Sequence, residues 1–178
     1  MNTANKLTML RFGLAVLFIV LFYVNHMYAQ IAAFFVFAAA SFTDFLDGYI
    51  ARKYNQITKL GKLTDPLADK ILVFSALILL VEKGYIYGWL VIVILSRDLM
   101  MSIFRAVAAA HNIVIAADIL GKIKTVFQMI SILMILFGKA FKVDLIFRAG
   151  YALLLLAVVL TILSGVNYIY KNRRVLEE

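Results

Sequence analysis

Four aspartates lie within a stretch of 26 residues, 44–69, that long apolar runs flank on both sides. Asp44 and Asp47 are three residues apart, and Asp65 and Asp69 are four apart, so on helices each pair shares one face. These are four of only ten carboxylate side chains in the sequence. On adjacent helices all four would converge, and their mutual repulsion would call for bound cations. Because hard oxygen ligands suit Mg²⁺ or Mn²⁺ better than Zn²⁺, we expect two such divalent ions here.

The residues around the aspartates suggest a phosphate ligand. Gly48 and Gly61 would allow a phosphate or nucleotide to approach the backbone closely, where a side chain would block it. Arg52, one helical turn after Gly48, is able to pair with phosphate charge. Helix capping is the simpler alternative, since Asp65 precedes Pro66 at a possible helix start. Capping accounts for one or two of the aspartates, but not for four on matched faces.

The composition indicates an integral membrane protein. Of the 178 residues, 65% are hydrophobic and only 16% are charged, which is more apolar surface than a soluble domain of this size can bury. Apolar runs of about 20 residues span a bilayer as helices. We therefore expect an all-α membrane protein with six transmembrane helices, forming a single catalytic domain over residues 1–178. The expected helices cover residues 12–24, 31–52, 63–81, 86–110, 119–137 and 145–170.

The positive charges predict the orientation in the membrane. With the amino terminus inside, thirteen Lys and Arg residues fall on the inner side and four on the outer side, Arg97 being left out as intramembrane. Both termini and the aspartates are then expected at the cytoplasmic face of a multi-pass protein of the cell membrane. The net charge of +8 suits membrane lipids or phosphorylated substrates better than nucleic acid. Without cysteine, disulfides and thiol chemistry are excluded.

A second group of charges lies in the later helices. Arg97 is within an expected span, Arg105 follows two turns later, and Lys122 and Lys124 open the next helix. Charges inside a membrane span are functional candidates, and a cationic pocket on the cytoplasmic side suits an acceptor that carries a phosphate. The alternatives are that the lysines are positive-inside anchors and that Asp98 neutralises Arg97 locally.

The acidic region resembles the motif of the CDP-alcohol phosphotransferase family. All eight fixed positions of that motif are present at the required spacing: Asp44, Asp47, Gly48, Ala51, Arg52, Gly61, Asp65 and Asp69. The six expected helices agree with the family's fold, so the resemblance covers essentially the whole chain.

The resemblance implies the chemistry. A CDP-linked lipid would bind through its pyrophosphate to two divalent ions, with Asp44, Asp47, Asp65 and Asp69 as metal ligands. Asp69 would also take the proton from the acceptor hydroxyl, which attacks the lipid-linked phosphorus and releases CMP. Gly48, Arg52 and Gly61 would line the nucleotide site. The resemblance also suggests a homodimer.

The acceptor is indicated by looser motifs. The lead with Asn5, Thr8 and Arg11 and the segments around Arg97, Arg105, Lys122 and Lys124 are similar to those of phosphatidylglycerophosphate synthases. This similarity implies CDP-diacylglycerol as donor and glycerol 3-phosphate as acceptor, with Asn5 and Thr8 near the CDP group.

Two other functions stay open from the sequence. Within the same family, the acceptor would be phosphatidylglycerol, as in a cardiolipin synthase, or serine or inositol phosphate. A divalent-cation transporter is a more distant alternative, because intramembrane aspartates also mark ion paths. It is disfavoured because the aspartates lie near one face of the membrane, with no polar residues continuing to the other.

Overall fold

The computed structural model describes residues 3–54, 59–110 and 119–171. Within these ranges, the side chains of residues 3–8, 44–54, 59–69, 105–106, 108–110, 169 and 171 lie outside the description. All of the described secondary structure is helical, as the composition predicted. The six helices are α1 (Thr3–Tyr23), α2 (Met27–Tyr54), α3 (Lys59–Glu82), α4 (Gly88–Ala110), α5 (Ile119–Ala140) and α6 (Asp144–Lys171).

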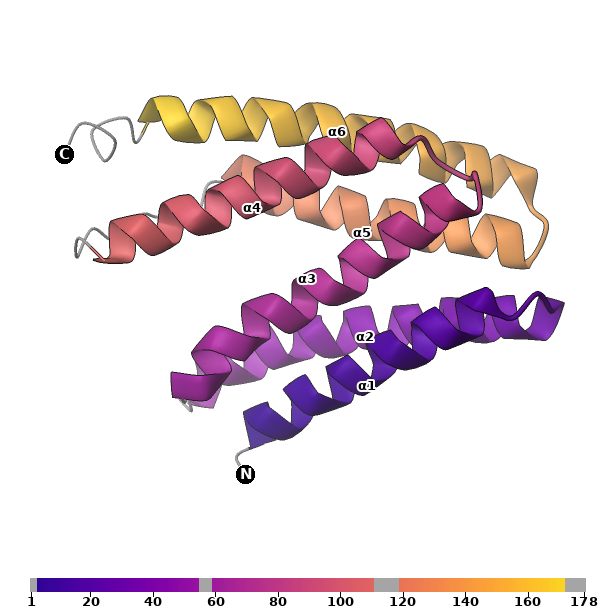
Figure 1. The fold of residues 1–178 in the computed structure, drawn as a ribbon, viewed down its shortest axis with the longest axis horizontal. Coiled ribbons are helices and arrows are strands. Elements are labelled where there is room, and N and C mark those ends of the chain that lie inside the picture. The colour runs from indigo at the N-terminus through magenta and orange to yellow at the C-terminus, as the bar shows by residue number, and fades with distance from the viewer. Residues whose placement is uncertain (1–2, 55–58, 111–118, 172–178) are drawn as a thin grey trace.

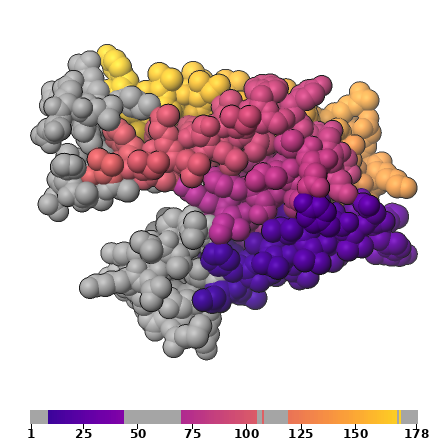
Figure 2. Space-filling view, viewed as in Figure 1, coloured from indigo at the N-terminus to yellow at the C-terminus, as the bar shows by residue number. Residues whose placement is uncertain are grey.

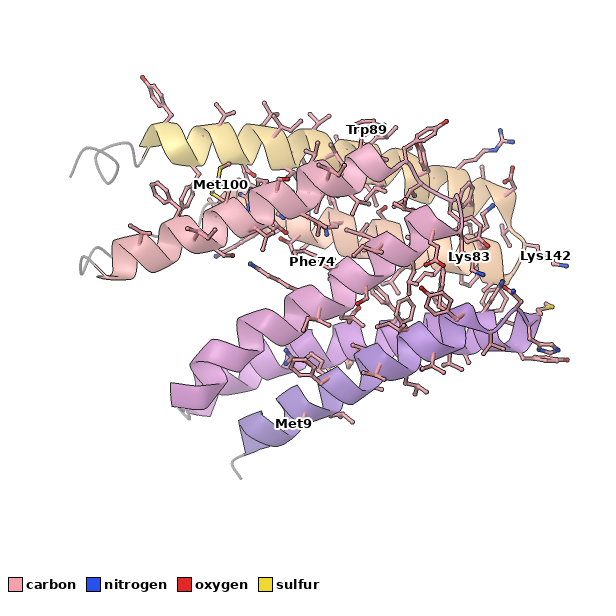
Figure 3. The ribbon with its side chains drawn as sticks, viewed as in Figure 1. Met9, Phe74, Lys83, Trp89, Met100 and Lys142 are labelled. Atoms are coloured by element: carbon pink, nitrogen blue, oxygen red, sulfur yellow. The ribbon has the colours of Figure 1, made fainter. Side chains whose placement is uncertain are left out.

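Successive helices run in opposite directions along the long axis of the molecule (Figure 1). The start of α1 and the end of α6 therefore lie at the same end of the bundle, which we call the terminal end. The end of α2, the start of α3, the end of α4 and the start of α5 lie at this end too, whereas the turns after α1, α3 and α5 lie at the opposite end. Lys83 and Lys142 both lie at that opposite end (Figure 3). This arrangement fits the alternation expected of a six-span protein.

The helix boundaries differ from the expected ones by nine residues at the start of the first helix and by four residues or fewer elsewhere. The first helix begins at Thr3, because the polar lead has no proline or glycine to interrupt it and continues into the apolar run. Helix α5 continues to Ala140, past the expected end at residue 137. It ends where Lys142 adopts a left-handed conformation, with φ of 56°, and the Val143 N–H donates to the Gly138 carbonyl at 2.9 Å.

The turn after α3 is the one that the sequence marked with a glycine. Gly84 has φ of 69°, in the left-handed region that favours glycine. The Tyr85 N–H donates to the Leu80 carbonyl and the Gly84 N–H donates to the Val81 carbonyl, both at 2.9 Å. These two bonds form a Schellman motif, which satisfies carbonyls at the end of the helix.

The core holds the first three helices against the rest of the bundle. Phe18 of α1 and Phe37 of α2 are fully buried, with ring centroids 5.4 Å apart. Leu77 and Leu80 of α3 are buried in the same cluster. Helix α2 also contacts α5, where the ring of Phe34 meets that of Phe137 edge-on at 5.5 Å. These apolar contacts join the two halves of the bundle.

Much of the outer surface is apolar. Large side chains such as Leu145, Ile92 and Val166 are exposed by 64% or more. In the space-filling view, α1, α3 and α4 form much of the near face (Figure 2). Helices α5 and α6 are long and apolar enough to cross a membrane. A surface of this kind suits contact with lipid rather than with water.

Helices α5 and α6 pack closely because small residues lie between them. A Cβ atom added to Gly138 would lie 2.6 Å from the backbone nitrogen of Phe147, and one added to Gly150 would lie 2.8 Å from the Cβ of Met134. The Ser131 hydroxyl donates to the Gly150 carbonyl at 2.8 Å across the same interface. Small residues allow such close backbone approach between apolar helices.

Gly138→Ala tests this packing. The added methyl group would meet backbone atoms of Phe147 that have no room to move, so we expect a loss of about 1–3 kcal/mol of stability. The midpoint of thermal unfolding in detergent should fall accordingly. Gly13→Ala is the matched control, because a Cβ there meets nothing within 4 Å and alanine favours the helix. Equal midpoints for the two variants would contradict the proposed close packing of α5 and α6.

Candidate active site

The four aspartates are carried by the facing ends of two consecutive helices. Asp44 and Asp47 lie in the second half of α2, and Asp65 and Asp69 lie in the first half of α3. The two helices are antiparallel and contact each other, and these parts of them lie toward the terminal end (Figure 1). The helical backbone places each pair on one helix face. The side chains themselves lie outside the described residues, so the convergence of the four carboxylates stays a prediction.

The expected nucleotide-binding residues are carried by the same helix ends. Asn5 and Thr8 are in the opening turns of α1, Gly48 and Arg52 are near the end of α2, and Gly61 is in the first turn of α3. Their side chains, and any contact made at these glycines, also lie outside the described residues. The fold thus carries all these positions toward one end of the bundle.

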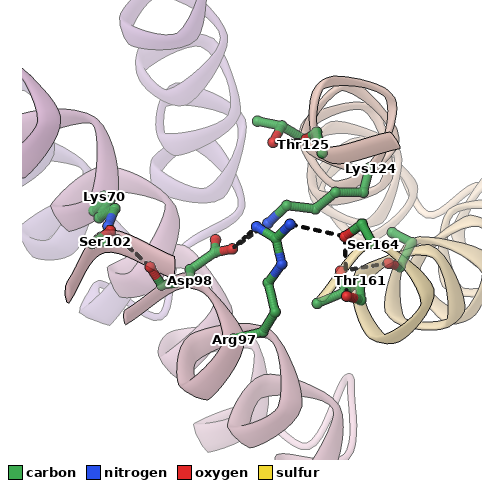
Figure 4. Close-up of polar contacts among 10 residues, drawn as sticks. Lys70, Arg97, Asp98, Ser102, Lys124, Thr125, Thr161 and Ser164 are labelled. Atoms are coloured by element: carbon green, nitrogen blue, oxygen red, sulfur yellow. Dashed lines mark hydrogen bonds and ion pairs between the residues drawn. The ribbon is translucent and has the colours of Figure 1, made fainter. Parts of the chain in front are cut away.

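The described part of the candidate site is a polar network centred on Asp98 of α4 (Figure 4). The Lys124 ammonium of α5 donates to Oδ1 of Asp98. The guanidinium of Arg97 lies beside the same oxygen, with NH1 at 3.4 Å. Its NH2 donates to the hydroxyl of Ser164 on α6 at 2.9 Å. One carboxylate therefore gathers two cations from neighbouring helices.

The network is largely shielded from the exterior of the bundle. The exposed fraction of the side chain is 3% for Lys124, 13% for Arg97 and 17% for Asp98. A buried charge is costly unless a partner of opposite charge and hydrogen bonds compensate for it. Asp98 is therefore a necessary counterion for the cations beside it, not an incidental neighbour.

The network also reaches α3. The Lys70 ammonium donates to the backbone carbonyl of Asp98 at 3.3 Å and to the hydroxyl of Ser102. The Ser102 hydroxyl in turn donates to the Asp98 carbonyl at 2.8 Å. Because Lys70 directly follows Asp69, these bonds attach the aspartate-bearing segment of α3 to α4.

Small residues make room for the Arg97 side chain. A Cβ added to Gly165 of α6 would lie 3.3 Å from Cγ of Arg97, and one added to Gly121 of α5 would lie 3.5 Å from its NH2. Within the described part of the chain, the buried Nε of Arg97 has no hydrogen-bond partner. The guanidinium therefore keeps donor capacity for an anion.

The structure brings together only some of the expected acceptor-site residues. Arg97 and Lys124 meet at Asp98, whereas the Lys122 side chain is exposed. Arg105 lies on α4, but its side chain is outside the described residues. The roles predicted for all four residues stay predictions.

Four participants in the network were not predicted from the sequence. Asp98 was expected to neutralise Arg97 locally, although its carboxylate also binds Lys124 on another helix. Lys70, Ser102 and Ser164 had no predicted role. A usable signal for Ser164 was its position beside Gly165 in an otherwise almost wholly apolar helix, where a polar residue needs a partner.

Among the described side chains, no group of three or more His, Asp or Glu is placed to hold a metal. The side chains of the four aspartates lie outside the described residues. Their donor set fits hard divalent cations, since carboxylate pairs spaced three and four residues apart lie on helical backbone at neighbouring helix ends.

Comparison with known proteins identifies the family. The family model for CDP-alcohol phosphatidyltransferase matches residues 1–163. The chain belongs to the CDP-alcohol phosphatidyltransferase family. The resemblance found in the acidic motif is thereby confirmed, and the chain is a transferase. The matched region contains the four aspartates, Asp98 and the two cations that approach its carboxylate, whereas Ser164 lies just beyond it.

Curated members of this family resemble the chain along nearly its full length. It is 38% identical to the CDP-diacylglycerol–glycerol-3-phosphate 3-phosphatidyltransferase of Bacillus subtilis, covering 96% of this chain and 95% of that protein. The protein of the same name from Rickettsia bellii is 36% identical, with coverages of 94% and 93%. A probable phosphatidylglycerophosphate synthase of Mycobacterium tuberculosis is 35% identical, with coverages of 97% and 82%.

Proposed function

We propose that this protein transfers the phosphatidyl group of CDP-diacylglycerol to glycerol 3-phosphate, giving phosphatidylglycerophosphate and CMP in phospholipid biosynthesis. The observation that carries the proposal is the similarity, over more than nine-tenths of the chain, to proteins named for this reaction. The acidic motif supports the reaction type, and the cations of α4 and α5 support an acceptor that bears a phosphate.

The proposal places the enzyme in the cell membrane with all six helices spanning it. Both termini and the aspartates would face the cytoplasm, where Lys and Arg residues are most numerous. The alternating helix directions support this topology, because they put the two chain ends on one side (Figure 1). A soluble phosphorylated acceptor would then reach the site from the cytoplasm and the lipid donor from the bilayer. The enzyme would act as a single domain over residues 1–178, in a homodimer.

Asp44, Asp47, Asp65 and Asp69 would hold two divalent cations, Mg²⁺ or Mn²⁺. Bound there, the cations would neutralise the charge of the pyrophosphate and of the departing CMP. Gly48, Arg52 and Gly61, with Asn5 and Thr8, would bind the nucleotide. The first three residues belong to the family motif, and Asn5 and Thr8 belong to the amino-terminal segment that resembles phosphatidylglycerophosphate synthases.

Asp69 would act as the general base. Its carboxylate would accept the proton of the acceptor hydroxyl, whose oxygen forms a bond to the phosphorus attached to diacylglycerol. The bond from that phosphorus to the oxygen of CMP breaks, and CMP leaves with the electron pair. Arg97, Arg105, Lys122 and Lys124 would bind the phosphate of the acceptor and orient its hydroxyl.

A direct assay tests the proposal. Purified protein with CDP-diacylglycerol, Mg²⁺ or Mn²⁺ and glycerol 3-phosphate should release CMP and form phosphatidylglycerophosphate, and chelation of divalent ions should stop both. Phosphatidylglycerol, serine and inositol phosphate serve as the acceptor panel. Preferential use of one of these would overturn the acceptor, while metal flux into liposomes without CMP release would favour a transporter.

Asp69→Asn tests the general base. The amide keeps the shape of the side chain but accepts no proton at neutral pH, so we expect CMP release to fall by about a hundredfold or more. The elution profile in detergent should stay unchanged. Asp144→Asn is the control, since Asp144 forms an exposed pair with Arg148 in the first turn of α6. Full activity of Asp69→Asn would refute the assignment.

Arg105→Ala and Lys122→Ala test the acceptor site. Removal of a cation that binds the acceptor phosphate should raise the KM for glycerol 3-phosphate about tenfold or more, since charge-assisted hydrogen bonds are involved. The KM for CDP-diacylglycerol should change little. Lys142→Ala, a change to an exposed lysine at the opposite end of the bundle, is the control. An unchanged acceptor KM in both variants would remove these residues from the site.

A further inference from the structure

The two described cations of the candidate acceptor site share a single counterion. Arg97 NH1 and Lys124 Nζ both approach Oδ1 of Asp98, although they come from different helices. Within the described part of the chain, Asp98 is the only acceptor that binds Lys124. Two cations drawn this close would repel each other strongly without the anion between them.

Hydrogen bonds to the backbone carbonyl of Asp98 fix the position of this residue. Its carbonyl accepts hydrogen bonds from Lys70 and from Ser102, so this turn of α4 is attached to α3. On the other side, Arg97 is attached to α6, because Ser164 accepts from its NH2 and donates to the Thr161 carbonyl at 3.1 Å. The carboxylate thus lies at the junction of four helices (Figure 4).

We propose that Asp98 is a positioning residue, whose carboxylate holds Arg97 and Lys124 in the arrangement that binds the phosphate of the acceptor. This inference rests on the proposed function. Arg97 keeps an unused buried donor at Nε, so pairing with Asp98 does not exhaust its capacity for a second anion. Cations that are fixed before the acceptor arrives bind it without the entropic cost of ordering them.

The alternative is that Asp98 only stabilises the fold. A purely structural role would make a neutral variant less stable without a selective effect on the acceptor. A third possibility is that the carboxylate occupies the place of the incoming phosphate. A neutral variant would then bind the acceptor more tightly. The three possibilities therefore differ in their kinetic outcome.

Asp98→Asn separates them. The amide keeps the size of the side chain and the backbone carbonyl that Lys70 and Ser102 contact, but it removes the charge shared by Arg97 and Lys124. We expect the KM for glycerol 3-phosphate to rise by about ten- to a hundredfold. The kcat at saturating acceptor and the KM for CDP-diacylglycerol should change by less than about threefold. Asp98→Glu, which retains the charge, should restore part of the acceptor affinity.

Asp144→Asn is the matched control, because it removes the carboxylate of the exposed pair with Arg148 and should leave both KM values unchanged. If Asp98→Asn is too unstable to purify, the double variant Asp98→Asn with Lys124→Met removes both members of the buried pair. Its acceptor KM should exceed that of Lys124→Met alone, because Asp98 also holds Arg97.

An unchanged or lowered acceptor KM in Asp98→Asn would overturn the inference, and so would a fall in kcat alone. An acceptor KM of the double variant no higher than that of Lys124→Met would also overturn it. The proposed function fails separately, if the unaltered protein does not release CMP with glycerol 3-phosphate.

Discussion

Placing charge inside a bundle of apolar helices is costly. Arg11 and Lys124 are each only 2% exposed, and Arg97 and Asp98 are largely shielded. Such charges persist only where carboxylates, hydroxyls and carbonyls compensate for the loss of water. At Asp98 the compensation comes from four helices, so the requirement to pair charges also fixes how α3, α4, α5 and α6 meet.

The interior of the bundle differs along its length, although exposed polar pairs such as Tyr23 with Glu82 also occur at the end with the short turns. Toward the end that carries the short turns, rings and aliphatic side chains such as Tyr85 and Phe147 fill the space, and Lys139 lies over both rings at 4.7 and 3.9 Å. Toward the terminal end the helices carry the aspartates and the Asp98 network. Glycines contribute to the packing in both regions. Gly138 allows the backbones of α5 and α6 to approach closely, and Gly165 leaves room for the side chain of Arg97.

The fold was more predictable from the sequence than the contacts within it. Long apolar runs set the number and order of the helices, and Gly84 marked one helix end. The end of α5 depends on a left-handed Lys142, a residue type that gives no such signal. The aspartates could be identified as candidate site residues because their motif lies within one short stretch of the sequence. The pairing of Asp98 with Lys124 joins residues 26 positions apart, and it depends on how two helices are rotated toward each other.

Helical rotation also explains why Lys122 and Lys124 differ. Residues two apart on a helix point in nearly opposite directions, so one of the two is buried and the other is exposed. The same geometry applies to Asp69 and Lys70, which are about 100° apart on α3. On the proposed assignment, one turn of α3 therefore carries the general base and also the ammonium that binds α4. The distance between the base and the acceptor site is then set by a packed helix rather than by a loop. Such rigidity suits the transfer reaction, because the base must come within hydrogen-bond distance of the acceptor hydroxyl.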